Sequence, residues 1–163
     1  MLIRPFSPDD VDAMNAVALA AFAQYETVYS DWQSLARGVG AMASLAEQAE
    51  MIVAEDRMGA VVGGVAYFGP GKTPRAEFFE DDWPIIRMLV VHPSARGNGI
   101  GRALTEKCVS RARQDGARLI AIHTSPVMEV ALSMYLAMGF KLARNVPDRF
   151  GVPYAVYLMS LCR

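Results

Sequence analysis

Three glycines within five residues mark the segment best suited to chemistry, in the run Arg96-Gly97-Asn98-Gly99-Ile100-Gly101. Because glycine has no side chain, the backbone N–H groups of such a turn can point towards one position. The first turn of a following helix adds unpaired N–H groups and a positive dipole end, which together favour an anion such as a pyrophosphate. Arg96 and Arg102 could add charged hydrogen bonds to phosphate oxygens.

Glycine spacing tests two other phosphate-binding patterns. A dinucleotide fingerprint, G-x-G-x-x-G, that starts at Gly97 and Gly99 requires a glycine at position 102, which is Arg102. A P-loop requires G-x-x-x-x-G-K-[ST], which this turn does not contain. The spacing disfavours a nucleotide-binding module and leaves two interpretations, a pyrophosphate site or a tight strand-to-helix turn without a ligand.

The elements around the turn must position it. Ile85–Val91 is a nearly continuous apolar run with Arg87 inside it, which is typical of a strand buried on both faces. Apolar residues four apart predict a helix over residues 99–114. Another strand is predicted over residues 117–123. Strand, crossover helix and strand in this order predict a right-handed βαβ unit with two parallel strands.

The remaining segments complete a mixed α/β sheet. Helices are predicted over 8–23, over 30–49 with a break near Gly38 and Gly40, and over 127–138. Further strands are predicted at 2–6, 51–55, 60–68, 140–146 and 152–161. A length of 163 residues predicts one domain that covers residues 1–163.

Composition excludes several classes of partner. Sixteen basic and seventeen acidic side chains give a net charge of −1, which disfavours nucleic-acid and membrane-surface binding. The two cysteines form no disulfide framework and offer no metal-ligand spacing. With no secretory signal and no apolar run of 18 residues, the sequence predicts a cytoplasmic protein that binds no metal.

The strand and turn, IIRMLVVHP followed by R-x-x-G-x-G, resemble the acyl-CoA-binding segment of the GNAT superfamily of N-acyltransferases. Downstream, the run from Tyr135 to Phe140 matches that family's Y-x-x-x-G-F pattern, with Ala131 four residues before the tyrosine. Order and spacing agree across residues 85–140. The resemblance implies a GNAT-like fold, a central mixed β-sheet with splayed parallel strands flanked by about four helices.

The resemblance also implies acetyl-CoA as the acyl donor. In this family the pyrophosphate lies on the amides of the turn, and the pantetheine arm follows the preceding strand where the two parallel strands splay. The residues implied to contact it are Leu89, Val90, Val91, Arg96, Gly97, Asn98, Gly99, Ile100, Gly101 and Arg102.

Tyr135 stands at the position of the family's general acid. A phenol with a pKa near 10 keeps its proton at neutral pH and can protonate a departing thiolate. The alternative from the helix pattern alone is a ring packed in the core with its hydroxyl bonded to backbone. No Cys or Ser is placed to form an acyl-enzyme, so direct transfer in a ternary complex is expected.

The general base is not evident. Many relatives carry Glu at the position of Ile85 and Asn at the position of Met128, where Thr124 or Ser125 could replace the amide. An acidic and aromatic stretch could attract a cationic amine or act through water, and a strand-end histidine could face the cleft. The alternative for the acidic stretch is a solvent-exposed loop, and the alternative for the histidine is a strand-end side chain with its hydrogen bonds made within the protein. The substrate-binding candidates are therefore Glu80, Asp81, Asp82, Trp83 and His123.

The sequence thus predicts an enzyme that transfers an acetyl group from acetyl-CoA to a primary amine of a small molecule or peptide. The alternative is a non-catalytic acyl-CoA-binding sensor module, which the missing Glu and Asn favour and the retained Tyr135 opposes. Dimers are common among relatives, so a homodimer is one alternative for its assembly. The acceptor, the acyl length and the oligomeric state stay open.

Overall fold

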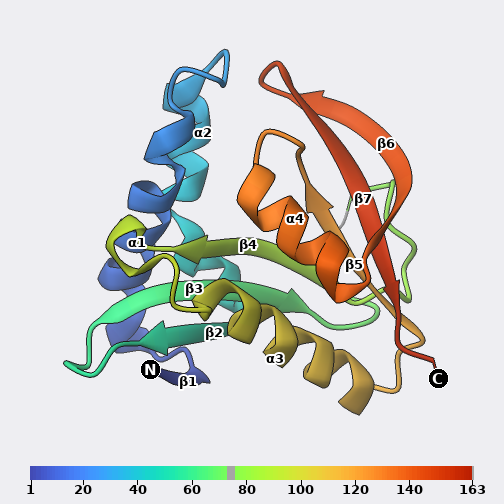
Figure 1. The fold of residues 1–163 in the computed structure, drawn as a ribbon, viewed down its shortest axis with the longest axis horizontal. Helices are drawn as coiled ribbons and strands as arrows, with labels where there is room; N and C mark the ends of the chain where they lie inside the picture. The colour runs from blue at the N-terminus through green and yellow to red at the C-terminus, as the bar shows by residue number, and fades with distance from the viewer. Residues whose placement is uncertain (73–75, 163) are drawn as a thin grey trace.

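The computed structural model describes residues 1–72 and 76–162. In these ranges one seven-stranded sheet runs in the order β1-β2-β3-β4-β5-β7-β6 (Figure 1). Neighbouring strands are antiparallel except β4 and β5, which are parallel. The strands are β1 (Leu2–Pro5), β2 (Glu50–Glu55), β3 (Val61–Phe68), β4 (Ile85–Val91), β5 (Leu119–Thr124), β6 (Lys141–Arg149) and β7 (Val152–Ser160).

Helices cover both faces of the sheet (Figure 1). One face packs against α1 (Val11–Phe22), α2 (Trp32–Val39) and a 3-10 helix (Met42–Glu47), and the other against α3 (Ile100–Gln114) and α4 (Glu129–Met138). Each face has its own apolar cluster, because successive strand residues point to opposite sides. This arrangement confirms the predicted fold class, a mixed sheet flanked by helices.

Short polar contacts set the helix boundaries. The Asp10 carboxylate accepts the backbone N–H of Ser7 at 2.8 Å just before α1, and the Asp31 carboxylate accepts the N–H of Ser34 at 3.1 Å as the N-cap of α2. α2 ends at Val39 with Gly40 as its C-cap, and a separate 3-10 helix follows, so the predicted break is confirmed. None of the described helices is both long and apolar enough to span a lipid bilayer.

The unit β4–α3–β5 has the predicted parallel strands, and the two strands splay. They pair only at Ile85 with Ala121 and at Ile86 with Ile122. Beyond Ile86, no described residue of β4 pairs with β5, so one backbone edge of β4 borders open space.

Strand β4 contains a bulge at this point. The register with β3 shifts so that Val65 faces two residues, Met88 and Leu89. Met88 has φ 56°, a left-handed conformation that is uncommon for a residue with a Cβ. The bulge interrupts the alternation of side chains, and as a result the four consecutive residues 86–89 all border one cavity.

We expect Gly63→Ala to destabilise the fold. A Cβ on Gly63 would lie 2.9 Å from Ile100 Cγ2 and 3.1 Å from the Val90 carbonyl oxygen. Neither neighbour can move without shifting α3 or β4, so the free energy of unfolding should fall by about 1–3 kcal/mol in urea denaturation. In the control Gly38→Ala, the new Cβ meets no atom within 4 Å, and stability should rise by about 0.4–1 kcal/mol. An unchanged midpoint for Gly63→Ala would contradict the packing.

Candidate active site

A groove of about 440 Å³ runs past the end of β4 to the start of α3. Leu89 and Val91 border it, together with most of the glycine turn, the start of α4 and the end of α1. Two of the predicted contact residues do not line it. The Val90 side chain is buried in the core on the α1 side, and the Asn98 amide donates back to the Ala95 carbonyl at 2.9 Å.

The glycine turn exposes its backbone donors at the end of this groove. Gly97 has φ 81° and Gly99 has φ 75°, a region that glycine enters without strain, and Gly99 is the N-cap of α3. No hydrogen bond of normal length joins the N–H groups of residues 97–102 to another group of the described protein. Unpaired N–H donors at the positive end of a helix make this turn a candidate anion site.

The two arginines of the turn border the groove in different ways. The Arg96 guanidinium donates to the Ala21 carbonyl at 3.3 Å, which ties the turn to the end of α1. Arg102 is exposed and pairs with Glu106 one helical turn away, at 2.9 Å. An exposed pair of this kind contributes little to stability, so the Arg102 charge is available to a bound anion at small cost.

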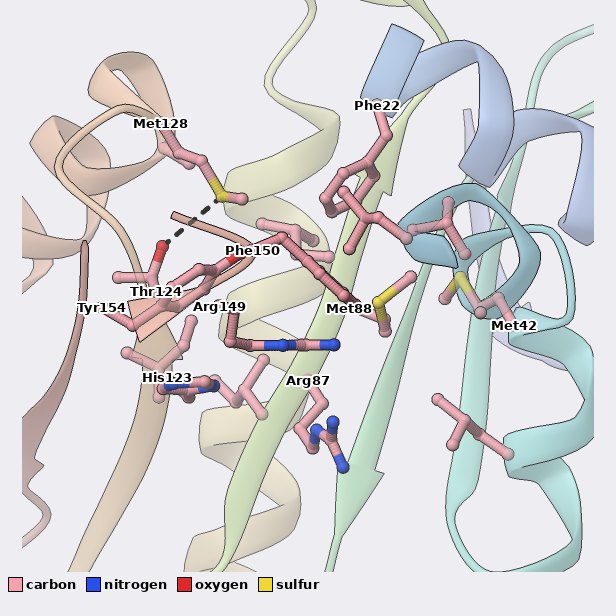
Figure 2. A pocket seen from close by; sticks show the side chains of 18 of the residues that line it. Phe22, Met42, Arg87, Met88, His123, Thr124, Met128, Arg149, Phe150 and Tyr154 are labelled. Atoms are coloured by element: carbon pink, nitrogen blue, oxygen red, sulfur yellow. Dashed lines mark hydrogen bonds between the residues drawn. The ribbon is translucent and has the colours of Figure 1, made fainter. Parts of the chain in front are cut away.

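A second cavity, of about 300 Å³, adjoins the groove (Figure 2). Its walls come from β4, β5, α2, the 3-10 helix 42–47 and the tip of the β6–β7 hairpin. Groove and cavity share the residues Phe22, Leu89, Met128 and Ala131. The two spaces therefore meet where β4 has parted from β5.

Tyr135 of α4 lines the second cavity. Its side chain is buried, and its ring packs edge-on against Phe140 with the centroids 5.7 Å apart. Its hydroxyl has no hydrogen-bond partner among the described residues, so it lacks the backbone bond that a purely structural tyrosine would make. Burial raises the pKa of Tyr135 above the ordinary phenol value, which keeps the proton on the oxygen.

His123 of β5 borders this cavity and a smaller adjoining one of about 180 Å³. Its ring lies 4.6 Å from the ring of Tyr154 and 5.0 Å from that of Phe78, centroid to centroid. Nε2 is buried without a hydrogen-bond partner among the described residues. Burial and the charges of Arg149 and Arg87 lower the pKa of His123 to about 4, so the imidazole is neutral at pH 7.

Arg87 and Arg149 also border both of these cavities, and the search for site residues in the sequence missed them. Neither forms an ion pair with a carboxylate of the described residues. The sequence does mark Arg87 as unusual, because it is a charged residue inside an apolar strand. It does not mark Arg149, because a position at the end of a hairpin is typical of an exposed side chain.

The acidic stretch lies elsewhere. Glu80, Asp81 and Asp82 are exposed and line neither the groove nor the two cavities. Trp83 is buried in the core, and the Arg144 guanidinium of β6 lies 5.0 Å from its ring centroid and 3.6 Å from Glu80. Of the five substrate-binding candidates, the structure brings only His123 to the cavity.

The two positions that depart from the family pattern, Ile85 and Met128, both carry apolar side chains. Ile85 is buried in the core. Met128 borders both groove and cavity, and its sulfur accepts the Thr124 hydroxyl at 3.8 Å (Figure 2). Ser125 is fully buried, and its hydroxyl oxygen accepts the N–H of Val127. Neither hydroxyl borders the groove, so neither replaces the missing amide there.

Fold and site together define an α/β protein in which an amide-lined anion site opens onto a cavity with a protonated phenol. The family model described as "Acetyltransferase (GNAT) family" matches residues 15–140, and the chain belongs to this family. A comparison with curated proteins gives no match.

Solved structures share the fold over nearly the whole chain. One is described as a GCN5-related N-acetyltransferase, aminotransferase class-II, from Rhodopseudomonas palustris (TM-score 0.76, 23% identity, covering 98% of this chain and 95% of that one). Another is yncA, a putative acetyltransferase from Salmonella typhimurium with its cofactor acetyl-CoA (TM-score 0.70, 19% identity, covering 100% of this chain and 95% of that one). A third is a ribosomal-protein-alanine N-acetyltransferase from Brucella melitensis (TM-score 0.70, 22% identity, covering 99% of this chain and 100% of that one).

The depressed pKa of His123 predicts a specific acid sensitivity. The pKa is about 4 in the folded chain and about 6.5 in the unfolded chain, so the unfolded state binds more protons between these values. The free energy of unfolding should therefore fall as pH drops from 6.5 to 4, and it should fall less in His123→Phe. An NMR titration, assigned with His92→Asn, should place the His123 midpoint near pH 4, whereas a midpoint near 6.5 would contradict the buried environment.

Proposed function

We propose that this chain transfers an acetyl group from acetyl-CoA to a primary amine of a small molecule or peptide, directly within a ternary complex. The observation that carries the proposal is the junction of groove and cavity at Leu89, with Tyr135 on the cavity wall. Donor and acceptor would enter from opposite sides and meet where β4 has left β5. Membership of an acetyltransferase family supports the reaction type.

The groove fits the donor. Its pyrophosphate would lie on the N–H groups of residues 97–102, with added charge from Arg96 and Arg102. The pantetheine arm would follow the edge of β4 at Leu89 and Val91, where the backbone has no partner on β5. A solved structure with the same fold contains acetyl-CoA, which supports this choice of donor.

The residues at the junction supply the proton chemistry. The amine nitrogen attacks the thioester carbonyl carbon, a C–N bond forms, the C–S bond breaks, and the electron pair leaves on sulfur. Tyr135 donates its phenolic proton to that sulfur and recovers a proton through water from the attacking nitrogen. Backbone N–H groups of the unpaired edge of β4 would stabilise the charge that develops on the carbonyl oxygen.

Deprotonation of the amine does not need the missing glutamate. No Asp or Glu borders either cavity among the described residues, and the position of the family's Glu is the buried Ile85. The charges of Arg87 and Arg149 disfavour an ammonium nearby and lower its pKa, so its proton passes to water.

The absence of a carboxylate also favours a second candidate function, a sensor that binds acyl-CoA without turnover. The hydroxyl of Tyr135, which has no hydrogen-bond partner, opposes this candidate.

We expect Tyr135→Phe to lower kcat by roughly 10²–10⁴-fold, because the thiolate must leave without its proton. The Kd for CoA should stay within about twofold, since the ring that packs against Phe140 is kept. Release of free thiol from acetyl-CoA measures the first quantity and calorimetry the second. The control Tyr67→Phe removes another hydroxyl, which bonds Asp115 at 2.7 Å outside these spaces, and should keep kcat. An unchanged kcat in Tyr135→Phe would remove the acid role.

We expect Gly99→Val to raise the Kd for CoA at least tenfold. A β-branched residue does not adopt φ 75° readily, so the turn should rearrange and lose the convergence of its N–H groups. Gly59→Val is a matched control, because Gly59 has φ 82° with equally open space around its Cβ, in the β2–β3 turn. Equal Kd values for the two variants in calorimetry would argue against binding at the turn.

A further inference from the structure

We propose that the acceptor is a small amine that carries an anionic oxyacid group, as an α-amino acid does, and that Arg87 and Arg149 bind that group. The inference rests on the proposed function, because it names the acceptor class of the same site. Arg87 comes from β4 and Arg149 from the end of β6, and both border the same two cavities as His123.

Neither charge is paired with a carboxylate among the described residues. The other ion pairs of the described chain join Arg4, Arg102, Arg111 and Arg144 to carboxylates. Arg87 and Arg149 have no such partner, although the chain contains 17 acidic residues. Their closest aromatic contacts place Arg87 5.8 Å from the ring of Phe68 and Arg149 5.8 Å from the ring of Tyr154. A cavity with two cationic groups and no carboxylate is complementary to an anion.

Burial makes the Arg87 charge costly without a ligand, whereas Arg149 is exposed. Arg87 is half-buried, and burial followed by the charge of Arg149 lowers its pKa. An unpaired charge that has lost solvent is destabilising, and two like charges that face one space add repulsion. A carboxylate or phosphonate between them would offset both effects with charge-assisted hydrogen bonds, which the forked guanidinium makes well.

The rest of the cavity is small and largely apolar. Its apolar lining includes Leu35, Val39, Met42, Met88 and Phe150. Methionine side chains adapt to irregular apolar groups, so this wall suits an aliphatic side chain. The volume of about 300 Å³ is at the lower end for a ligand site, which favours a single amino acid over an oligosaccharide.

This assignment reverses the charge expected from the acidic stretch. That stretch suggested a cationic acceptor, but its carboxylates lie outside the cavity and Glu80 pairs with Arg144. The groups that face the cavity are cationic, and His123 beside them is neutral. A polyamine would place a second positive charge against Arg87 and Arg149.

Matched acceptors test the anionic group directly. Thiol release from acetyl-CoA is measured with leucine, leucinamide, 3-methylbutylamine and 1-amino-3-methylbutylphosphonate, which share one side chain. We expect kcat/KM for leucine to exceed that of the amide and of the plain amine by at least 10-fold to 100-fold. The phosphonate distinguishes a carboxylate site from a site for a dianion, according to which of the two acids reacts faster.

Variants assign the role to the two arginines. Arg87→Gln and Arg149→Gln should each raise KM for the preferred acid by about 10-fold to 100-fold and lower the ratio of kcat/KM for leucine to kcat/KM for 3-methylbutylamine by a similar factor. The control Arg113→Gln changes an exposed arginine of α3 and should alter neither. Loss of activity toward acid and plain amine alike would show a structural role and overturn the assignment.

The outcomes separate this inference from the proposed function. Equal or better activity with leucinamide or 3-methylbutylamine overturns the anionic acceptor and leaves acetyl transfer intact. If CoA binds but no amine reacts, the NMR titration of His123 tests the inference. Leucine added with saturating CoA should raise the pKa of His123, because its carboxylate offsets the charges of Arg87 and Arg149. An unchanged His123 pKa overturns the inference. Failure to bind CoA at all overturns the proposed function itself.

Discussion

Strands β4 and β5 exchange backbone hydrogen bonds only at their first residue pairs and then diverge, with Met88 bulged where they part. A buried backbone group without a partner costs about 1–3 kcal/mol, so a sheet that opens at its centre is stable only where solvent or a ligand reaches the gap. The opening creates the free edge of β4, directs residues 86–89 at one cavity and leaves α3 and α4 on either side of a continuous space. The junction of groove and cavity depends on this divergence.

The two ends of that space attract anions by different means. At the end of the groove, backbone N–H groups and a helix dipole supply partial charges that no pH change removes. In the cavity, full positive charges come from the long side chains of Arg87 and Arg149. A single substitution can remove each of these charges. Between them, the apolar surroundings of Tyr135 keep its phenol protonated. Under the proposed function, the donor would bind at the end with fixed partial charges and the acceptor at the end whose charges a substitution can change.

Contacts between distant segments close one side of the cavity. The tip of the β6–β7 hairpin touches the loop between α1 and α2, where the Ser30 N–H donates to the Phe150 carbonyl at 2.8 Å and the hydroxyls of Tyr29 and Tyr154 share a hydrogen bond. These contacts fix Phe150, and Arg149 next to it, over the cavity. Under the proposed function, Arg149 and Phe150 would thus join the acceptor site from outside the segment 85–140 that carries the family motifs, whereas Arg87 and His123 lie within it.

Local signals in the sequence determined the elements and the donor turn. Apolar periodicity, caps and glycines act over a few residues, so strands, helices and the break at Gly40 follow from the sequence alone. The tertiary structure alone decided which charges face the cavity. Arg149 borders the same cavity as Arg87 because the tip of the β6–β7 hairpin contacts the loop between α1 and α2, and Arg144 pairs with Glu80 of the acidic stretch outside that cavity. No spacing rule encodes such proximity, since it arises from packing between segments far apart in the chain.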